Sequence, residues 1–457
     1  MRRRPLHSAR RGEEGIIISL VAIFMLFVVG AMAALAIDVV TLYTARSEAQ
    51  LAADGAALAG ARVLANSGMT SDANAATDNL QSNAVSLATT IALQVAASNS
   101  VGGTQLNAGA SNCAAEICVS INTALANFLS NPQVQVTVQR TTLPTFFARI
   151  WGTTTVAVKA TATAEAYNPS LLAGVGASEP PVAPVCVKPW LLPNISPNNP
   201  ALQIFNTTTG AIGDTGLLGW ETVSQTSGTN PAANTYLWNA CTGTGACTSI
   251  PAPSPWYYLP GDPSSFATPP AASVSCSPTA FFYSGTPYQL SVAGCVQTPI
   301  ACNQTVNIDV TDDITNQDTA AAVNCLTHAT GNHADSVDET TYAGPPNYAP
   351  FEFEAGGDDP LVTAGTISVG TDMPVSDSLV TVPVFNSTGT ITSPATVIGF
   401  VQLFLNPEGH DVHMGGMQAY KVHTMVTNLI GCGTGATGTP AVNGNGSSAV
   451  AVRLITP

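Results

Sequence analysis

A long apolar run without a charged residue follows closely behind a cluster of arginines. The run spans residues 16–37 and reads IIISLVAIFMLFVVGAMAALAI. As a helix it would be roughly 33 Å long, enough to cross a bilayer core about 30 Å thick. The basic residues before it are Arg2, Arg3, Arg4, Arg10 and Arg11. Because positive charge beside a span stays in the cytoplasm, we expect residues 1–15 inside and the chain after Asp38 outside.

A cleaved signal peptide is the alternative interpretation of this run. Ala31-Met32-Ala33 and Ala34-Leu35-Ala36 both have the small-x-small pattern of a cleavage site. The run is longer, however, than the usual h-region of about 7–15 residues, and the helical pattern continues past these alanines. We therefore expect a retained transmembrane helix.

The composition argues against nucleic-acid binding. The net charge is −15, only 9% of the residues are charged, and the pI is about 4.5. Five of the thirteen basic residues lie in the first eleven positions, so the exterior part is more acidic than the whole. Such a surface repels phosphate backbones. We expect no nucleic-acid partner.

All ten cysteines follow the apolar run, which suggests up to five disulfides in an oxidising compartment. Cys113 with Cys118 and Cys241 with Cys247 are spaced for small local loops. Cys186 and Cys432 bracket the second half of the chain and could staple it. The sequence contains no C-x-x-C pair, and the connectivity stays open.

The helical pattern continues beyond the apolar run, from Asp38 to Leu64. Small residues recur there along two neighbouring lines of one helix face. They are Ala49, Ala53 and Ala57, and Ala52, Ala56 and Gly60. Small side chains let another backbone approach closely. Two interpretations stay open: the strip packs within its own domain, or it packs on other subunits.

Residues 10–64 resemble the N-terminal segment of TadG-like proteins of the Flp (tight adherence) pilus system. The matching features are a basic start ending at Arg11, the apolar run, Asp38 at its exit and the block QLAADGAALAGARVL at residues 50–64. Gly55 stands where members of that family typically have alanine. The resemblance implies a membrane-anchored pilus-assembly protein.

A second block, residues 133–167, resembles the same family. Val134, Val136 and Val138 alternate with polar residues, which predicts a half-buried strand. Residues 143–152, LPTFFARIWG, suit a short helix closed by glycine. Residues 155–165 alternate again. Between the two blocks we expect an alanine-rich helix over residues 71–98 and a short strand over residues 116–121.

Two features of related proteins are absent from the sequence. Prepilins have a glycine before the cleavage point and a glutamate at the fifth position after it. Here Leu20 occupies the fifth position after Gly15, where prepilins have the glutamate, and this argues against prepilin processing. The D-x-S-x-S motif of the von Willebrand A domain found in some relatives is also missing.

The second half of the chain predicts a disulfide-tied, mainly β domain. Residues 169–185 have the composition of a linker, and residues 186–457 contain short β-like runs between loops rich in Pro, Gly and Thr. The runs are residues 280–283, 305–310, 379–385, 396–405 and 423–430. Pro383 would confine its strand to a sheet edge. The fold class is thus α+β, with a transmembrane helix at 16–37, an α+β domain at 38–168 and the β domain after the linker.

Several groups of residues match catalytic or ligand patterns only weakly. Gly433-x-Gly435-x-x-Gly438 is followed by Pro440 where a nucleotide-binding helix would begin. The histidines His410, His413 and His423 could gather a metal. Acidic residues could bind calcium between loops, although they fit no EF-hand spacing. These are Asp309, Asp312, Asp313, Asp318, Asp358 and Asp359. We expect surface or core roles for all of them.

The sequence therefore favours a non-enzymatic, single-pass protein of the bacterial inner membrane. The sequence contains no G-x-S-x-G, H-E-x-x-H or P-loop motif, and we expect no catalytic, cofactor or metal residues. The resemblance implies contacts with other pilus-assembly proteins or pilins, with the bulk of the chain periplasmic or on the cell surface. The alternative is an anchored adhesin or envelope protein without a pilus role.

Overall fold

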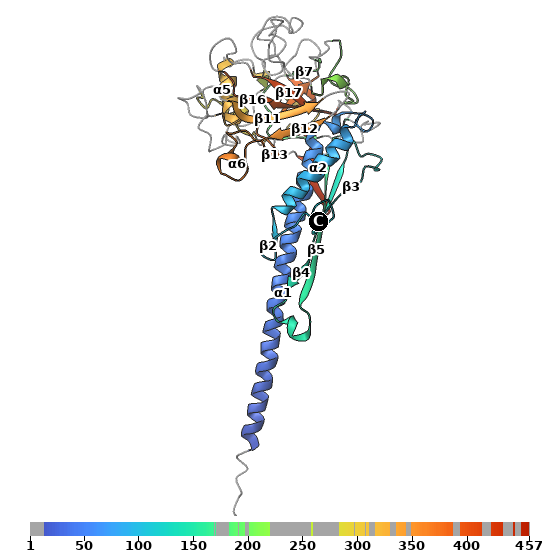
Figure 1. Ribbon diagram of the computed structural model, residues 1–457. Coiled ribbons are helices and arrows are strands. Elements are labelled where there is room, and N and C mark those ends of the chain that lie inside the picture. The colour runs from blue at the N-terminus through green and yellow to red at the C-terminus, as the bar shows by residue number, and fades with distance from the viewer. Residues whose placement is uncertain are drawn as a thin grey trace, which may run out of the picture.

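The computed structural model shows a long N-terminal helix whose second half lies beside a small sheet, with a rounded, β-rich head at its end (Figure 1). It describes residues 13–168, 170, 182–190, 192–196, 201–219, 257–258, 283–296, 298–306, 308–309, 316–329, 335–343, 349–386, 394–413, 422–432, 442–443 and 449–456. Helix α1, Glu13–Asn66, is 54 residues long and runs without a break from the apolar segment into the folded part. The predicted α+β class is confirmed.

The second half of α1 packs against helix α2 (Leu80–Ala97) and an antiparallel sheet of order β19-β5-β4-β3. We call these elements the helix–sheet unit. The strands are β3 (Ile117–Ile121), β4 (Gln133–Pro144), β5 (Thr155–Tyr167) and β19 (Ala451–Thr456). In the ladder, Val134 and Val136 face Ala164 and Ala162, and all four are fully buried. Valines opposite alanines leave a smooth face on which α1 lies closely.

The two strands predicted within residues 133–167 are confirmed, and the short helix predicted at 143–152 is limited to the 3₁₀ helix at residues 148–151. β4 and β5 form a long hairpin that runs beside α1 (Figure 1). Its loop contains the 3₁₀ helix η2, Ala148–Trp151, which ends at Gly152 with a φ of +92°. That left-handed conformation is the one a helix-terminating glycine adopts readily.

The predicted helix over residues 71–98 is correct only from Leu80 onward. A short 3₁₀ helix, η1 (Met69–Ser71), precedes a run of turns. In these turns the Asp72 carboxylate accepts from the Asn74 N–H, and that of Asp78 accepts from the Leu80 N–H. Short polar side chains of this kind bind nearby backbone and compete with the helix. Small hairpin strands β1 (Ser100–Val101) and β2 (Thr104–Gln105) follow α2.

The C-terminal strand β19 departs from the predicted division of the chain at residues 169–185. It pairs with β5 in the helix–sheet unit instead of joining the head. The Arg453 guanidinium lies 2.6 Å from the Glu165 carboxylate, whose side chain is 5% exposed. Without Arg453, the Glu165 carboxylate would be a buried charge without a counter-charge. Strand β6 (Val182–Ala183) also lies within the predicted linker and pairs with β18 (Val442–Asn443).

The centre of the head is a sheet of order β17-β15-β14-β7, with β9 paired to β15. Its strands are β7 (Leu192–Pro193), β9 (Thr305–Val306), β14 (Leu379–Phe385), β15 (Ala395–Leu405) and β17 (Thr424–Gly431). Every residue of β14 and β17 is buried, including the polar Thr381, Thr424, Thr427 and Asn428. Burial on both faces explains why these segments show no alternation of apolar and polar residues. The strands predicted at 379–385, 396–405 and 423–430 are confirmed. The run predicted at 305–310 contains two short strands in different sheets, β9 and β10 (Ile308–Asp309), and most of 280–283 lies outside the described residues.

The prediction that Pro383 lies on an edge strand is wrong, because β14 is flanked by β15 and β7. The Thr381 carbonyl accepts from the Lys188 N–H, so Thr381 and Pro383 direct their backbone groups toward the β7 side. Pro383 falls between the points where residues 187 and 192 pair with β14. The missing N–H of proline therefore breaks no pair in the ladder.

A helix that the sequence analysis missed covers one face of this sheet. Helix α5, Asn316–Leu326, packs with α4 (Pro287–Ala293) against alternate residues of β14 and β15. Ala320, Ala321 and Ala322 are fully buried. At eleven residues, α5 has too few turns to show a clear period. Its burial comes from the sheet that it covers.

A second sheet and short elements complete the described head. The sheet has the order β13-β12-β11-β16. Its strands are β11 (Asp335–Ala343), β12 (Ala349–Glu354), β13 (Asp372–Met373) and β16 (Glu408–His410). The remaining elements are β8 (Tyr257–Tyr258), β10 (Ile308–Asp309), η4 (Thr215–Leu217) and α6 (Pro360–Thr363).

Three disulfides tie the described chain together. They join Cys113 to Cys118, Cys186 to Cys295 and Cys302 to Cys432. The local pair at Cys113 is confirmed. Cys186 and Cys432 do not form a disulfide with each other. Cys186 pairs with Cys295, and Cys432 pairs with Cys302. Cys325 is also disulfide-bonded, and the predicted pair of Cys241 and Cys247 lies outside the described residues.

Candidate membrane anchor and the contacts that hold it

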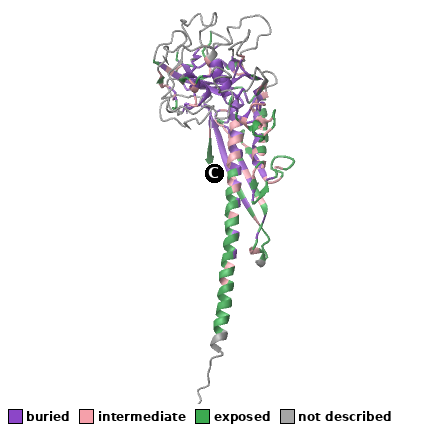
Figure 2. Ribbon diagram, turned by 90° about the vertical axis from the view of Figure 1, so that its left-hand side faces the viewer, coloured by how far each residue is buried: buried purple, intermediate pink, exposed green. Residues whose placement is uncertain are grey.

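The first part of α1 is apolar and almost wholly exposed. Phe24, Leu26 and Phe27 are 64%, 75% and 70% exposed, and Figure 2 shows the exposed colour along this part of the helix. One helix of the described chain is long and apolar enough to cross a membrane, and only 6% of its most apolar segment is buried. A core helix of a soluble domain would bury this surface. The exposure therefore favours a membrane span.

The alanine strip begins where this exposed stretch ends, and it is buried within the chain itself. Ala49, Ala53 and Ala57 are fully buried, as are Ala52 and Ala56. They belong to the core that α1 forms with α2, β4 and β5. The structure thus supports the intramolecular interpretation of the strip. The alternative, a surface for partner subunits, is wrong for these residues because no accessible area remains to them.

Gly60 shows why this strip needs small residues. A Cβ atom at this position would lie 3.0 Å from Val134 Cγ1 and 3.3 Å from the Ala88 carbonyl oxygen. The helix backbone therefore approaches both α2 and the sheet as closely as a glycine allows. Ser47, on the opposite side of the helix, is exposed. Arg62 is partly buried, and this desolvation lowers its pKa.

Asp38 joins the end of the apolar run to the loop of the β4–β5 hairpin. Its Oδ1 accepts from the Phe146 N–H at 2.9 Å, and its Oδ2 accepts from the N–H groups of Phe147 and Ala148 at 3.1 Å and 2.7 Å. The carboxylate thereby caps η2, which begins at Ala148. One side chain of α1 thus fixes the loop at the level where the apolar run ends.

The electrostatics of Asp38 agree with a charged carboxylate. Its exposed fraction is only 4%. Burial alone raises the pKa of Asp38, but the three N–H donors together outweigh this effect, and its net pKa lies below the ordinary value. An isolated aspartate at a membrane exit would be poorly solvated, and these donors replace water around it.

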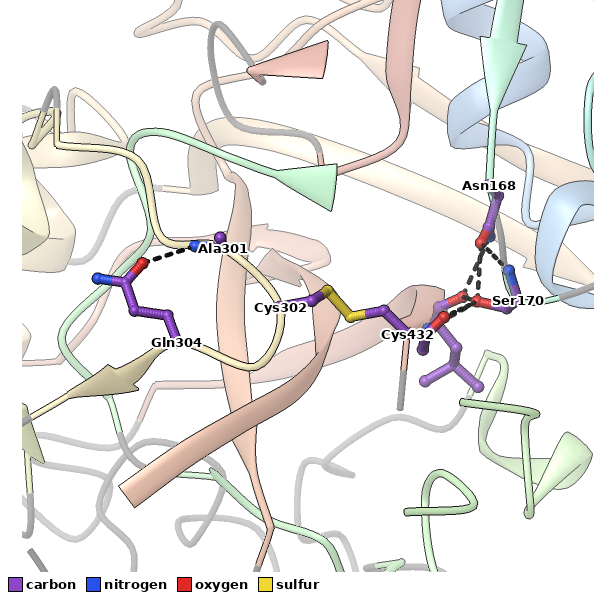
Figure 3. The surroundings of a disulfide bond; sticks show 8 residues. Asn168, Ser170, Ala301, Cys302, Gln304 and Cys432 are labelled. Carbon is purple, nitrogen blue, oxygen red and sulfur yellow. Dashed lines mark hydrogen bonds between the residues drawn. A yellow bond between two sulfur atoms is a disulfide. The ribbon is translucent and has the colours of Figure 1, made fainter. Parts of the chain in front are cut away.

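A buried polar network joins the helix–sheet unit to the head. Asn168 Nδ2 donates to the carbonyl oxygens of Thr70 and Leu429, at 2.9 Å and 3.1 Å. Ser170 Oγ accepts from the Gly431 N–H at 2.6 Å, directly before Cys432 (Figure 3). Asn428 donates to the Ala65 carbonyl oxygen at the end of α1. The end of α1 and strand β17 are therefore held together by hydrogen bonds between buried groups.

The histidines and acidic residues that could have bound a metal do not form a metal site among the described residues. Among the described residues, no group of three or more His, Cys, Asp or Glu could hold a metal ion. The Asp358 carboxylate accepts from Ser336 Oγ at 2.6 Å, and Asp359 caps α6 by accepting from the Leu361 N–H. His410 lies 3.5 Å from Glu408 on the surface of β16. Asp312, Asp313 and the glycines at 433, 435 and 438 lie outside the described residues.

The comparison with family models matches the segment that contains the exposed helix, Asp38 and the strip. Residues 15–63 match the family described as putative Flp pilus-assembly TadE/G-like. The N-terminal segment is TadE/G-like. The predicted resemblance is confirmed for this segment, which is about a tenth of the chain. No curated protein and no solved structure matches the chain.

The TadE/G-like segment coincides with the two roles of α1. Its first half is the exposed apolar stretch, and its second half is the buried strip that ends near Val63. The second block at residues 133–167 lies outside the match but supplies the hairpin on which that strip packs. The polar network with Asn168 and Asn428 was missed by the sequence analysis, because single polar residues far apart in sequence carry no periodic signal.

Proposed function

We propose that this protein is a non-enzymatic, membrane-anchored component of Flp pilus assembly that acts through protein–protein contacts. The observation that carries the proposal is the coincidence of the TadE/G-like match with an exposed apolar helix. That match supports involvement in Flp pilus assembly. The folded part beyond Asp38 offers the surface for other assembly proteins or pilins.

We further propose that the span lies in the bacterial inner membrane, with the folded part in the periplasm or at the cell surface. The five arginines before the run support this orientation, because they remain on the cytoplasmic side. The disulfides support an oxidising compartment for everything beyond the span.

The number of Flp pili on the cell tests the proposed function. Cells that lack this gene should show few or no pili by electron microscopy, and the wild-type gene supplied in trans should restore them. A chain in which residues 16–37 are replaced by a cleavable signal should be exported but should not restore pili, because it has no anchor. Normal pili on cells that lack the gene would contradict the proposal and favour the anchored adhesin without a pilus role.

A further inference from the structure

The loop of the β4–β5 hairpin lies at the level where the apolar stretch of α1 ends. We call residues 145–151 the hairpin tip. Three consecutive N–H groups of the tip, at residues 146–148, bind the Asp38 carboxylate over distances of 2.7–3.1 Å. Asp38 directly follows the uncharged run at 16–37. If that run fills the bilayer core, the tip backbone lies at the boundary between hydrocarbon and water.

The tip is held rigidly at this level by more than Asp38. Thr145 Oγ1 donates to the Thr153 carbonyl oxygen at 2.5 Å. The Gly152 N–H donates to the Arg149 carbonyl oxygen at 3.1 Å. The strands on either side of the tip pair with each other up to Pro144 and Thr155, and both pack on α1. The tip therefore moves with the helix, and its height above the bilayer is fixed by the fold.

The exposed side chains of the tip suit a lipid surface better than water. Phe146 is 59% exposed, although Thr145 beside it is buried. Arg149 is exposed as well, and residues 143–154 contain this one charge and no carboxylate. Aromatic rings beside a cation are typical of the membrane interface, where the ring meets acyl chains and the guanidinium meets phosphate.

We propose that the hairpin tip is a second membrane contact, with Phe146 in the acyl–headgroup boundary and Arg149 on lipid phosphate. The inference rests on the proposed membrane anchor. A single helix can tilt and rotate about its axis in a bilayer, whereas a second contact on one side restricts both motions. The tip would thus fix the direction in which the helix–sheet unit and the head face the other assembly proteins.

Lipid crosslinking from position 146 in the full-length protein tests this contact. The photoreactive analogue p-benzoylphenylalanine replaces Phe146, and in a matched control chain it replaces Val369. Val369 is 65% exposed in the head between α6 and β13. After irradiation of native membranes, mass spectrometry should find about tenfold or more lipid adduct at 146 than at 369, because the head lies outside the bilayer.

The other outcomes separate the tip contact from the anchor. If the protein remains in alkali-washed membranes but position 146 yields no lipid adduct, the tip contact is refuted and the anchor stands. If position 146 crosslinks to a protein instead of lipid, the tip binds a protein partner and the inference is wrong. If the alkaline wash removes the protein, the anchor itself fails, and the tip contact fails with it.

Discussion

Replacing Ala53 or Ala56 by leucine should sharply reduce the amount of folded protein, rather than leave a stable protein that has lost its partners. Both side chains are fully buried between α1, α2 and the sheet. Inserting a larger side chain into a packed core costs about 1–3 kcal/mol, and sometimes more. Such a cost is a large fraction of a typical stability of about 5–15 kcal/mol. Immunoblots of membranes and thermal unfolding of the purified variants would measure the loss.

Ser47→Leu is the matched control for these variants. It adds a similar volume to the same helix at an exposed position, so its level and unfolding temperature should stay close to wild type. Gly60→Leu should be at least as disruptive as the alanine variants, since even a Cβ at this position lies 3.3 Å from a carbonyl oxygen. A folded Ala56→Leu protein that no longer joins pilus components would contradict the intramolecular packing and restore the partner interpretation.

Removing the Cys302–Cys432 disulfide should destabilise the head much more than removing the Cys113–Cys118 disulfide. The first closes a sequence separation of 130 residues and the second one of 5. By the chain-entropy relation, the losses are about 5 kcal/mol and about 2 kcal/mol. Cys302 and Cys432 are also almost fully buried, beside the joint with the helix–sheet unit (Figure 3).

Each disulfide is best removed by replacing both cysteines with alanine, which leaves no free thiol. Denaturant unfolding of the two double variants then compares them directly with wild type. Equal losses would mean that loop closure does not govern their contribution, and that strain or residual structure in the unfolded chain dominates instead. A larger loss for the Cys113–Cys118 pair would contradict the prediction outright.

Local patterns predicted the elements whose burial repeats along the chain. The valines of β4 alternate with the period of a strand, and the run at residues 16–37 was evident from its length and its lack of charge. The long β14, β15 and β17 strands were also evident, because each is rich in apolar and β-branched residues. What these patterns leave open is the partner of each element.

The features that the sequence analysis missed depend on contacts between distant residues. β19 joins the first sheet through β5, some 290 residues earlier in the chain. Pro383 is tolerated inside the sheet because it falls between the points where residues 187 and 192 pair with β14, which no local pattern indicates. Asp38 was noted as part of the resemblance, but its contacts with residues 146–148 became evident only when the hairpin and helix were placed together.

The topology of the full-length chain tests the central claim, that α1 changes from a membrane span to a buried core helix at Asp38. Alkaline phosphatase fused after residue 457 should be active, and the fusion should remain in the alkali-washed membrane pellet with the apolar run intact. In a control, replacing the five N-terminal arginines by glutamate should lower the phosphatase activity, because the orientation signal is lost. A soluble protein whose mature N-terminus is Ala34 or Ile37 would contradict the account, since it would show that the apolar run is a cleaved signal.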